Sequence, residues 1–201
     1  MSGRDQTTIF NTAVLSGLFH YLARLVMRLL GWRVQGSLPD LPKFVLIGAP
    51  HTSNWDFVLF LGVIFTLRAN VRFMGKMELF RWPTAAFFRY CGGVPVERSK
   101  STGLVDQMVE ACNKSDKFIL TIAPEGTRHH VQEWKRGFYH IAKGAGIPIV
   151  MAIVDGKHKT VHIGQVFHPT ENMEADMTAI KGFFTGIVGI NPRRKYITLT
   201  N

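Results

Sequence analysis

Short apolar runs alternate with longer segments of helical character along most of the chain. The short runs contain few polar residues, as expected for strands that are buried on both faces of a sheet. The alternation predicts an α/β fold, in which helices flank a mostly parallel or mixed sheet in one layered domain. The expected strands are residues 43–48, 70–74, 94–96, 118–122, 147–154 and 160–166, and the expected helices are residues 57–68, 79–90, 104–113, 135–146 and 171–184.

The N-terminal apolar segment, residues 9–32, has helical periodicity but makes a poor transmembrane helix. His20, Arg24 and Arg28 interrupt it, and they lie opposite an apolar arc of roughly 140°. This pattern predicts an amphipathic helix that lies among lipid headgroups, and the alternative is that the same face packs on the core of the protein. The arc contains Leu15, Leu18, Phe19, Leu22, Leu25, Val26, Leu29 and Leu30.

A connector rich in Gly and Pro follows this segment, with Gly36, Pro39 and Pro42 before the first expected strand. The N-terminal residues show no cleavage site typical of a secretory signal. We therefore expect an amphipathic, membrane-associating segment over residues 1–35 and the α/β domain over residues 36–201.

The composition is both basic and apolar. The chain has 24 Lys and Arg against 14 Asp and Glu, for a formal net charge of +10, and 46% of its residues are hydrophobic. The charge predicts a polyanionic partner, and the apolar content favours an anionic membrane surface over nucleic acid. Cys91 and Cys112 have no framework spacing and are interpreted as reduced thiols. No glycine-rich nucleotide loop and no familiar zinc-ligand spacing is present, so neither a nucleotide cofactor nor a metal is expected.

A histidine follows the first expected strand of the domain, where catalytic groups are common in α/β folds. In the segment Pro50-His51-Thr52-Ser53-Asn54-Trp55-Asp56, a carboxylate comes five residues after that histidine. A tight loop would let Asp56 bind one ring nitrogen of His51 and leave the other as a general base. The alternative is a surface histidine beside a helix that begins with a capping residue, such as Ser53.

Three further motifs occur at or near expected strands. The first, Gly92-Gly93-Val94-Pro95-Val96-Glu97-Arg98, places an arginine after a glycine-rich turn and a short strand. The second, Ala123-Pro124-Glu125-Gly126-Thr127-Arg128, follows the strand at residues 118–122. The third is Ile147-Pro148-Ile149-Val150.

Taken in order, H-x4-D, G-x4-E-R, P-E-G-T-R and I-P-I-V resemble the motifs of the glycerolipid acyltransferase family, which includes the 1-acylglycerol-3-phosphate acyltransferases. The resemblance spans roughly residues 44–155. It implies that an acyl group moves from a thioester donor to the hydroxyl of a lysophospholipid such as 1-acylglycerol-3-phosphate. Acyl-CoA or acyl carrier protein would then be a substrate rather than a cofactor. The enzyme would act at the cytoplasmic face of the cell membrane, as a peripheral or monotopic protein.

The resemblance also implies roles for individual residues. His51 would be the general base, and Asp56 would orient it. Arg98 and Arg128 would bind the phosphate of the acceptor, because a guanidinium matches the geometry of phosphate oxygens. Thr127 and the amide of Gly126 would add hydrogen-bond donors to this phosphate site. Glu125 would belong to it too, either by holding one of the arginines or by contacting the acceptor.

Several positions depart from the family pattern and leave the acceptor open. Glu97 stands where Asp is more common, Pro95 replaces a bulky apolar residue, and Met151 replaces a second proline. A lyso-aminolipid or another lysophospholipid is therefore an alternative acceptor. A non-catalytic, basic membrane-binding protein is the alternative from a different functional class.

Overall fold

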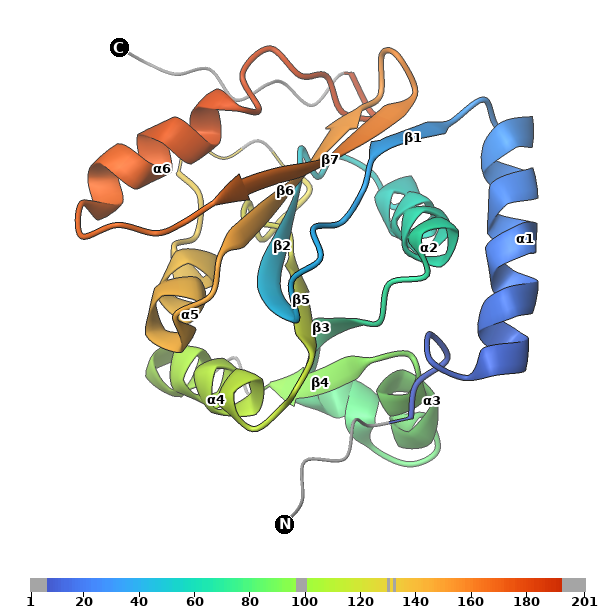
Figure 1. Cartoon of the computed structure of the whole chain (residues 1–201), viewed down its shortest axis with the longest axis horizontal. Coiled ribbons are helices and arrows are strands. Elements are labelled where there is room, and N and C mark those ends of the chain that lie inside the picture. The colour runs from blue at the N-terminus through green and yellow to red at the C-terminus, as the bar shows by residue number, and fades with distance from the viewer. Residues whose placement is uncertain (1–6, 97–100, 130, 132, 193–201) are drawn as a thin grey trace.

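The strands of the chain form a single sheet in the order β1-β7-β6-β2-β5-β3-β4 (Figure 1). This arrangement comes from a computed structural model that describes residues 7–96, 101–129, 131 and 133–192. The strands are β1 (Arg33–Gly36), β2 (Lys43–Ala49), β3 (Val71–Lys76), β4 (Gly93–Val96), β5 (Phe118–Ile122), β6 (Ile149–Asp155) and β7 (Thr160–Phe167). The helices are α1 (Ala13–Leu29), α2 (Trp55–Leu67), α3 (Ala85–Tyr90), α4 (Ser101–Asn113), α5 (Gly137–Ala145) and α6 (Met173–Gly182), with a 3₁₀ helix, η1, at Met77–Phe80.

The sheet is mixed, as the sequence predicts. Strands β6, β2, β5, β3 and β4 are parallel, whereas β7 is antiparallel to β6 and β1 is parallel to β7. Strand β2 lies at the centre between β6 and β5. The loops that follow β2 and β5 therefore leave the same edge of the sheet from neighbouring strands.

Helices cover both faces of the sheet, and successive residues of β2 point into two separate cores (Figure 1). Val45 and Ile47 join the core beneath α4, α5 and α6. Phe44 and Leu46 join the core on the side of α1 and α2. The strand lacks polar alternation because its residues enter these two cores in turn. This confirms the prediction of a sheet that is covered on both faces.

Two parts of the chain differ from the sequence-based expectation. The Gly- and Pro-rich connector contains a strand, β1, whose residues pair with β7 from Arg33↔Thr160 to Gly36↔Ile163. The boundary expected between residues 35 and 36 thus falls inside a strand of the sheet. The helix expected over residues 79–90 is shorter: the chain first forms η1 and a turn, and α3 begins at Ala85, after Pro83.

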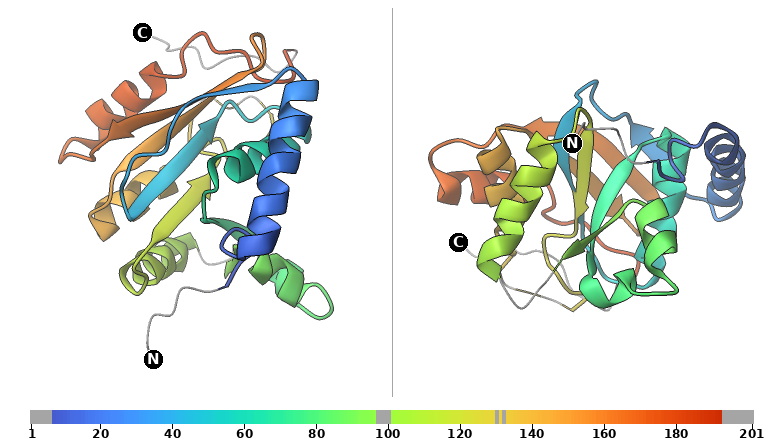
Figure 2. Two further views of the ribbon diagram at one scale, coloured as in Figure 1. Left: turned by 45° about the vertical axis from the view of Figure 1, so that its right-hand side comes forward. Right: turned by 90° about the horizontal axis from the view of Figure 1, so that it is seen from below.

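Helix α1 lies outermost, with α2 between it and the sheet (Figures 1 and 2). It buries Ala23 and Met27, and the ring of Phe19 stacks on Phe65 of α2 at 5.0 Å. His20, which the sequence places on the polar side, turns towards α2, where its Nδ1 lies 3.0 Å from the carbonyl oxygen of Phe65.

The opposite side of α1 is apolar and faces away from the domain. Leu18, Leu25 and Leu29 are exposed to 61%, 54% and 76%. Most of the expected apolar arc is therefore not used for packing on the core. No helix among the described residues has the length and hydropathy needed to cross a bilayer.

Candidate active site

The carboxyl ends of β2 and β5 bring the H-x4-D and P-E-G-T-R segments together. Ile47 of β2 is paired in register with Ile122 of β5, so the chain leaves both strands at the same level. Residues that are more than seventy positions apart thereby meet: the backbone N–H of His51 donates to Oε2 of Glu125 at 2.5 Å.

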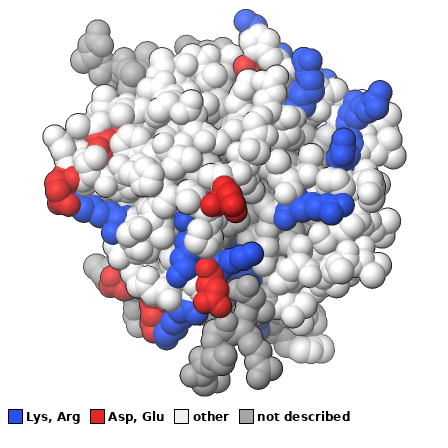
Figure 3. Space-filling view, in the orientation of Figure 1, with Lys and Arg blue, Asp and Glu red and all other residues white. Residues whose placement is uncertain are grey.

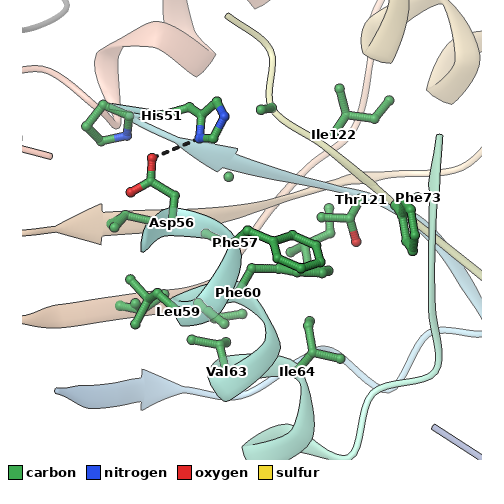
Figure 4. Close-up of a pocket in the computed structure, with 18 residues that line it drawn as sticks. His51, Asp56, Phe57, Leu59, Phe60, Val63, Ile64, Phe73, Thr121 and Ile122 are labelled. Carbon is green, nitrogen blue, oxygen red and sulfur yellow. Dashed lines mark ion pairs between the residues drawn. The ribbon is translucent and has the colours of Figure 1, made fainter. Parts of the chain in front are cut away.

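His51 and Asp56 form the ion pair expected from their spacing (Figure 4). Nδ1 of His51 lies 2.8 Å from Oδ2 of Asp56. The same oxygen accepts the backbone N–H groups of Thr52 at 2.6 Å and Ser53 at 2.7 Å. These contacts wrap the loop around the carboxylate at the start of α2. With Nδ1–H donated to Asp56, the neutral imidazole keeps its lone pair on Nε2, which is the arrangement required of a general base.

Ser53 contributes to the start of α2. Its Oγ accepts the backbone N–H of Trp55 at 3.2 Å. The contact supports a role in beginning the helix and gives no sign of a nucleophile activated by His51.

Glu125 is a buried carboxyl group that belongs to the His51 loop. The family resemblance places it in the phosphate site, and in the structure its carboxyl group accepts the backbone N–H of His51. Burial raises the pKa of Glu125 to about 7, against the opposing effect of the hydrogen bond from His51. The hydrogen bond to the backbone N–H of His51 ties this carboxyl group to the loop that carries the imidazole. We therefore assign Glu125 to holding the backbone of His51 in place.

The turn after Glu125 has a conformation that favours glycine. Gly126 has φ +65°, and its N–H donates to the carbonyl oxygen of Ala123 at 3.0 Å. This amide therefore donates within the turn, and its expected contact with a phosphate stays a prediction. Oγ1 of Thr127 accepts the backbone N–H of His129 at 3.3 Å, so its own O–H is still able to donate. The side chain of Arg128 is exposed at the end of the same turn.

A lysine that the motif analysis missed lies over this turn. The backbone N–H of Lys135 donates to the carbonyl oxygen of Pro124 at 2.9 Å. A Cβ atom added to Gly126 would lie 2.8 Å from Cδ and 3.1 Å from Nζ of Lys135. The side chain of Lys135 thus brings a cation over the P-E-G-T-R turn. Ten residues of sequence separate Glu125 from Lys135, so only the folded turn reveals the contact.

Three other positions of the family motifs lie outside the site that the structure describes. Arg98 and Glu97 lie outside the described residues, which resume at Ser101 after β4 ends at Val96. Met151, one of the departures from the family pattern, is buried in the core beneath α4, α5 and α6. It therefore does not line the cavity described next.

An apolar cavity of about 260 Å³ opens beside the His51–Asp56 pair, between α2 and the sheet (Figure 4). Phe57, Phe60 and Val63 of α2 form one wall. Strands β2, β3, β5, β6 and β7 form the other, with side chains that include Phe73 and Ala152. A hydrocarbon chain suits this cavity, because its lining is almost entirely apolar.

A segment near the C-terminus clamps the His51 loop. The backbone N–H of Asn191 donates to Oγ1 of the buried Thr52 at 3.1 Å. Gly189 packs so closely on the same side chain that a Cβ added there would lie 2.5 Å from Oγ1 of Thr52. Only glycine fits this position without displacing the loop. No sequence motif marks the contact, because it joins residues from opposite ends of the domain.

Within residues 7–96, 101–129, 131 and 133–192, no group of three or more His, Cys, Asp and Glu side chains is arranged to hold a metal ion. A second His–Asp pair occurs at the turn between β6 and β7, where Nδ1 of His158 lies 2.6 Å from Oδ2 of Asp155. That pair does not line the apolar cavity.

Comparison with known proteins identifies related sequences. A family model described as "Acyltransferase" matches residues 33–154. A 1-acyl-sn-glycerol-3-phosphate acyltransferase of Haemophilus influenzae is 23% identical over 148 residues, which cover 68% of this chain and 60% of the relative. A protein with the same description from Saccharomyces cerevisiae is 29% identical over 144 residues, which cover 68% of this chain and 46% of the relative. The matched region thus spans 60% and 46% of the lengths of these two relatives.

Among solved structures, the crystal structure of the 1-acyl-sn-glycerophosphate (LPA) acyltransferase PlsC from Thermotoga maritima has the same fold. The TM-score is 0.61 at 19% sequence identity, and the superposition covers 84% of this chain and 76% of that chain.

Proposed function

Because this chain belongs to the acyltransferase family, we propose that it transfers a fatty acyl group from a thioester donor to the hydroxyl of a lysophospholipid such as 1-acylglycerol-3-phosphate. The observation that carries the proposal is the His51–Asp56 pair, which lies at the opening of an apolar cavity and beside the P-E-G-T-R turn. The names of the two curated relatives support the choice of acceptor.

The proposed reaction is a direct attack on the thioester. Nε2 of His51 removes the proton of the acceptor hydroxyl as its oxygen bonds to the carbonyl carbon. The carbon–sulfur bond then breaks, and the imidazolium returns the proton to the leaving thiolate. Asp56 stabilises the imidazolium in between, and the apolar cavity holds the acyl chain. The products are the acylated lipid and the free thiol of coenzyme A or of acyl carrier protein.

The release of free thiol tests this proposal. Purified protein with acyl-CoA or with acylated acyl carrier protein should release free thiol only when an acceptor is added. A panel of lysophospholipids and lyso-aminolipids identifies the acceptor. Release of thiol that is independent of every acceptor, or no release with any pair of substrates, would contradict the proposed function.

We expect Arg128→Ala to raise the KM for a phosphate-bearing acceptor with little change in the KM for the donor. The substitution removes a charge-assisted contact of about 1.5–3 kcal/mol, which corresponds to roughly a 10- to 150-fold change in KM. Steady-state kinetics with both substrates varied measures the effect. Arg136→Ala is a matched control, because Arg136 is nearby in sequence but binds Glu174. A rise in the KM for the donor instead would place Arg128 at the donor site.

We further propose that α1 attaches the enzyme peripherally to an anionic membrane, at the cytoplasmic face. On the side of the molecule that carries α1, Lys and Arg side chains stand among uncharged surface (Figure 3). On the opposite side, basic and acidic side chains are mixed (Figure 3). Arg24 and Arg28 of α1 are themselves exposed. An apolar helix face flanked by cations suits the boundary between headgroups and acyl chains.

Replacing Leu18, Leu25 and Leu29 together with glutamine should abolish sedimentation with anionic vesicles. These side chains point away from α2, so the packing of Ala23 and Met27 is retained. High salt alone should weaken binding of the unaltered protein only in part, because the apolar contribution does not depend on charge.

The matched control replaces three apolar residues that are exposed elsewhere, namely Leu41, Val166 and Phe183 at 37%, 38% and 37%. This triple variant should sediment with vesicles as the unaltered protein does. Equal binding by the α1 variant would contradict the attachment through α1.

A further inference from the structure

A second apolar groove, of about 420 Å³, lies between α1 and α2. One wall comes from α1 and includes Leu22 and Val26. The other comes from α2 and includes Trp55 and Val58. Apart from Lys159, the lining is apolar or glycine, and that lysine directs its ammonium group to the carbonyl oxygen of Leu30 at 3.1 Å. The groove is thus built for a ligand without charge along most of its length.

Helix α2 separates this groove from the cavity beside His51. Phe60 and Val63 face the cavity, Val58 and Gly62 face the groove, and Leu59 contributes to both. A helix that is apolar on all sides is normally buried, but α2 leaves Trp55 and Val58 exposed to 66% and 44%. Both hollows begin at the first turn of α2, where Asp56 holds His51.

The groove has a closed floor. Gly62 of α2 meets Met27 of α1 so closely that an added Cβ would lie 2.8 Å from the sulfur of Met27. Phe65 lines the end away from Trp55. The ten steps along the helix from Trp55 to Phe65 rise by about 15 Å, which gives the length over which an extended hydrocarbon chain could lie.

The proposed reaction requires room for two hydrocarbon chains. The acceptor already carries one chain, and the transferred chain becomes attached to the same molecule. The cavity between α2 and the sheet accounts for the transferred chain. We infer that the groove between α1 and α2 binds the hydrocarbon chain that the acceptor already carries, so that the two chains of the product straddle the first turn of α2. This inference rests on the proposed function, because it takes the acceptor to be a monoacyl lipid.

The kinetic test varies the two chains separately. In the unaltered enzyme, each added methylene of the acceptor chain that enters the groove should lower the KM by up to about fourfold, the equivalent of 0.8 kcal/mol per buried methylene. Val26→Phe and Val58→Phe place larger side chains in the groove at half-exposed positions. These variants should lose the dependence on acceptor chain length and keep the dependence on donor chain length. Acceptors are used below the concentration at which they aggregate, so that membrane attachment plays no part.

Two control variants make this result specific. Val166→Phe enlarges a half-exposed residue of β7 that lines neither the groove nor the cavity, and should leave both dependences unchanged. Ala152→Leu narrows the cavity beside His51 and should change only the preference for donor chain length. The inference is overturned if the groove variants keep the acceptor dependence, or if they change the donor dependence instead.

A binding measurement without turnover separates this inference from the proposed function. Trp32 and Trp55 line the groove, whereas the exposed Trp82 lies outside it and the buried Trp134 lies in the core on the other face of the sheet. A monomeric lysolipid with bromine atoms on its chain should quench the fluorescence of the protein, and most of that quenching should disappear in a Trp32→Phe/Trp55→Phe variant. Absence of quenching, or quenching that occurs only with vesicles, overturns the inference. Absence of thiol release together with specific quenching would instead count against the proposed reaction.

Discussion

Replacing His51 with alanine should lower kcat by about 10²–10⁴-fold, the usual contribution of a general base. Binding of the acceptor should be nearly unchanged, because the imidazole is not a phosphate ligand in the proposed site. Steady-state turnover together with direct measurement of acceptor binding checks both parts. Near-normal turnover by this variant would refute the assignment of His51 as the base.

The chain offers a matched control for this experiment. His158 binds Asp155 through Nδ1 at 2.6 Å, much as His51 binds Asp56 at 2.8 Å, but at a turn away from the cavity. His158→Ala should therefore leave kcat unchanged. Asp56→Asn should also lower kcat, because an amide no longer holds Nδ1–H of His51 and the preferred tautomer is lost. The loss should appear in kcat rather than in the KM for the acceptor.

The stability of the protein should depend on pH through Glu125. Its pKa is raised from 4.5 to about 7 by burial. Between these values the folded state keeps a proton that the unfolded state has released, so the free energy of unfolding falls as the pH rises. The loss approaches roughly 3 kcal/mol at 1.36 kcal/mol per pKa unit. Denaturant-induced unfolding between pH 4.5 and pH 8 measures it.

Glu125→Gln isolates this effect, because glutamine keeps an oxygen that accepts the N–H of His51 but does not ionise. The variant should lack this loss of stability and become more stable than the unaltered protein towards pH 8. Curves of stability against pH that run parallel for the two proteins would show that Glu125 does not titrate in this range.

The sequence predicts those parts of the fold whose signal is local. Strand β2 is recognisable because Phe44 to Ile47 form a continuous apolar run, and all four residues are buried in the structure. Strand β1 is not, since it is a short edge strand with Arg33 and Gln35 in a segment rich in Gly and Pro, and its strand conformation comes from pairing with β7. The helix expected over residues 79–90 is too long for a different reason: a 3₁₀ helix and a turn that contains Pro83 precede α3.

The same distinction holds for the candidate site. The contact of His51 with Asp56 follows from a spacing of five residues and is predicted correctly. The partner of Glu125 depends on β2 and β5 being neighbours in the sheet, which no local pattern reveals. The clamp of Gly189 and Asn191 on Thr52, and the approach of Lys135 to Gly126, likewise depend on the complete fold. Spacing thus predicts the contact between His51 and Asp56, whereas the contacts that hold their loop in place depend on the topology.

The pairing of β1 with β7 has a consequence for how the chain is made. Arg33 lies opposite Thr160, so one edge of the sheet joins the beginning of the chain to a segment close to its end. During synthesis α1 and α2 can meet before β7 has emerged, because their contacts join residues that are closer in sequence, such as Phe19 and Phe65. Strand β1 can pair only after residues 160–163 have emerged, because contacts between distant segments form late. We therefore expect a nascent chain to expose the apolar surfaces of α1 and α2 before its sheet is complete.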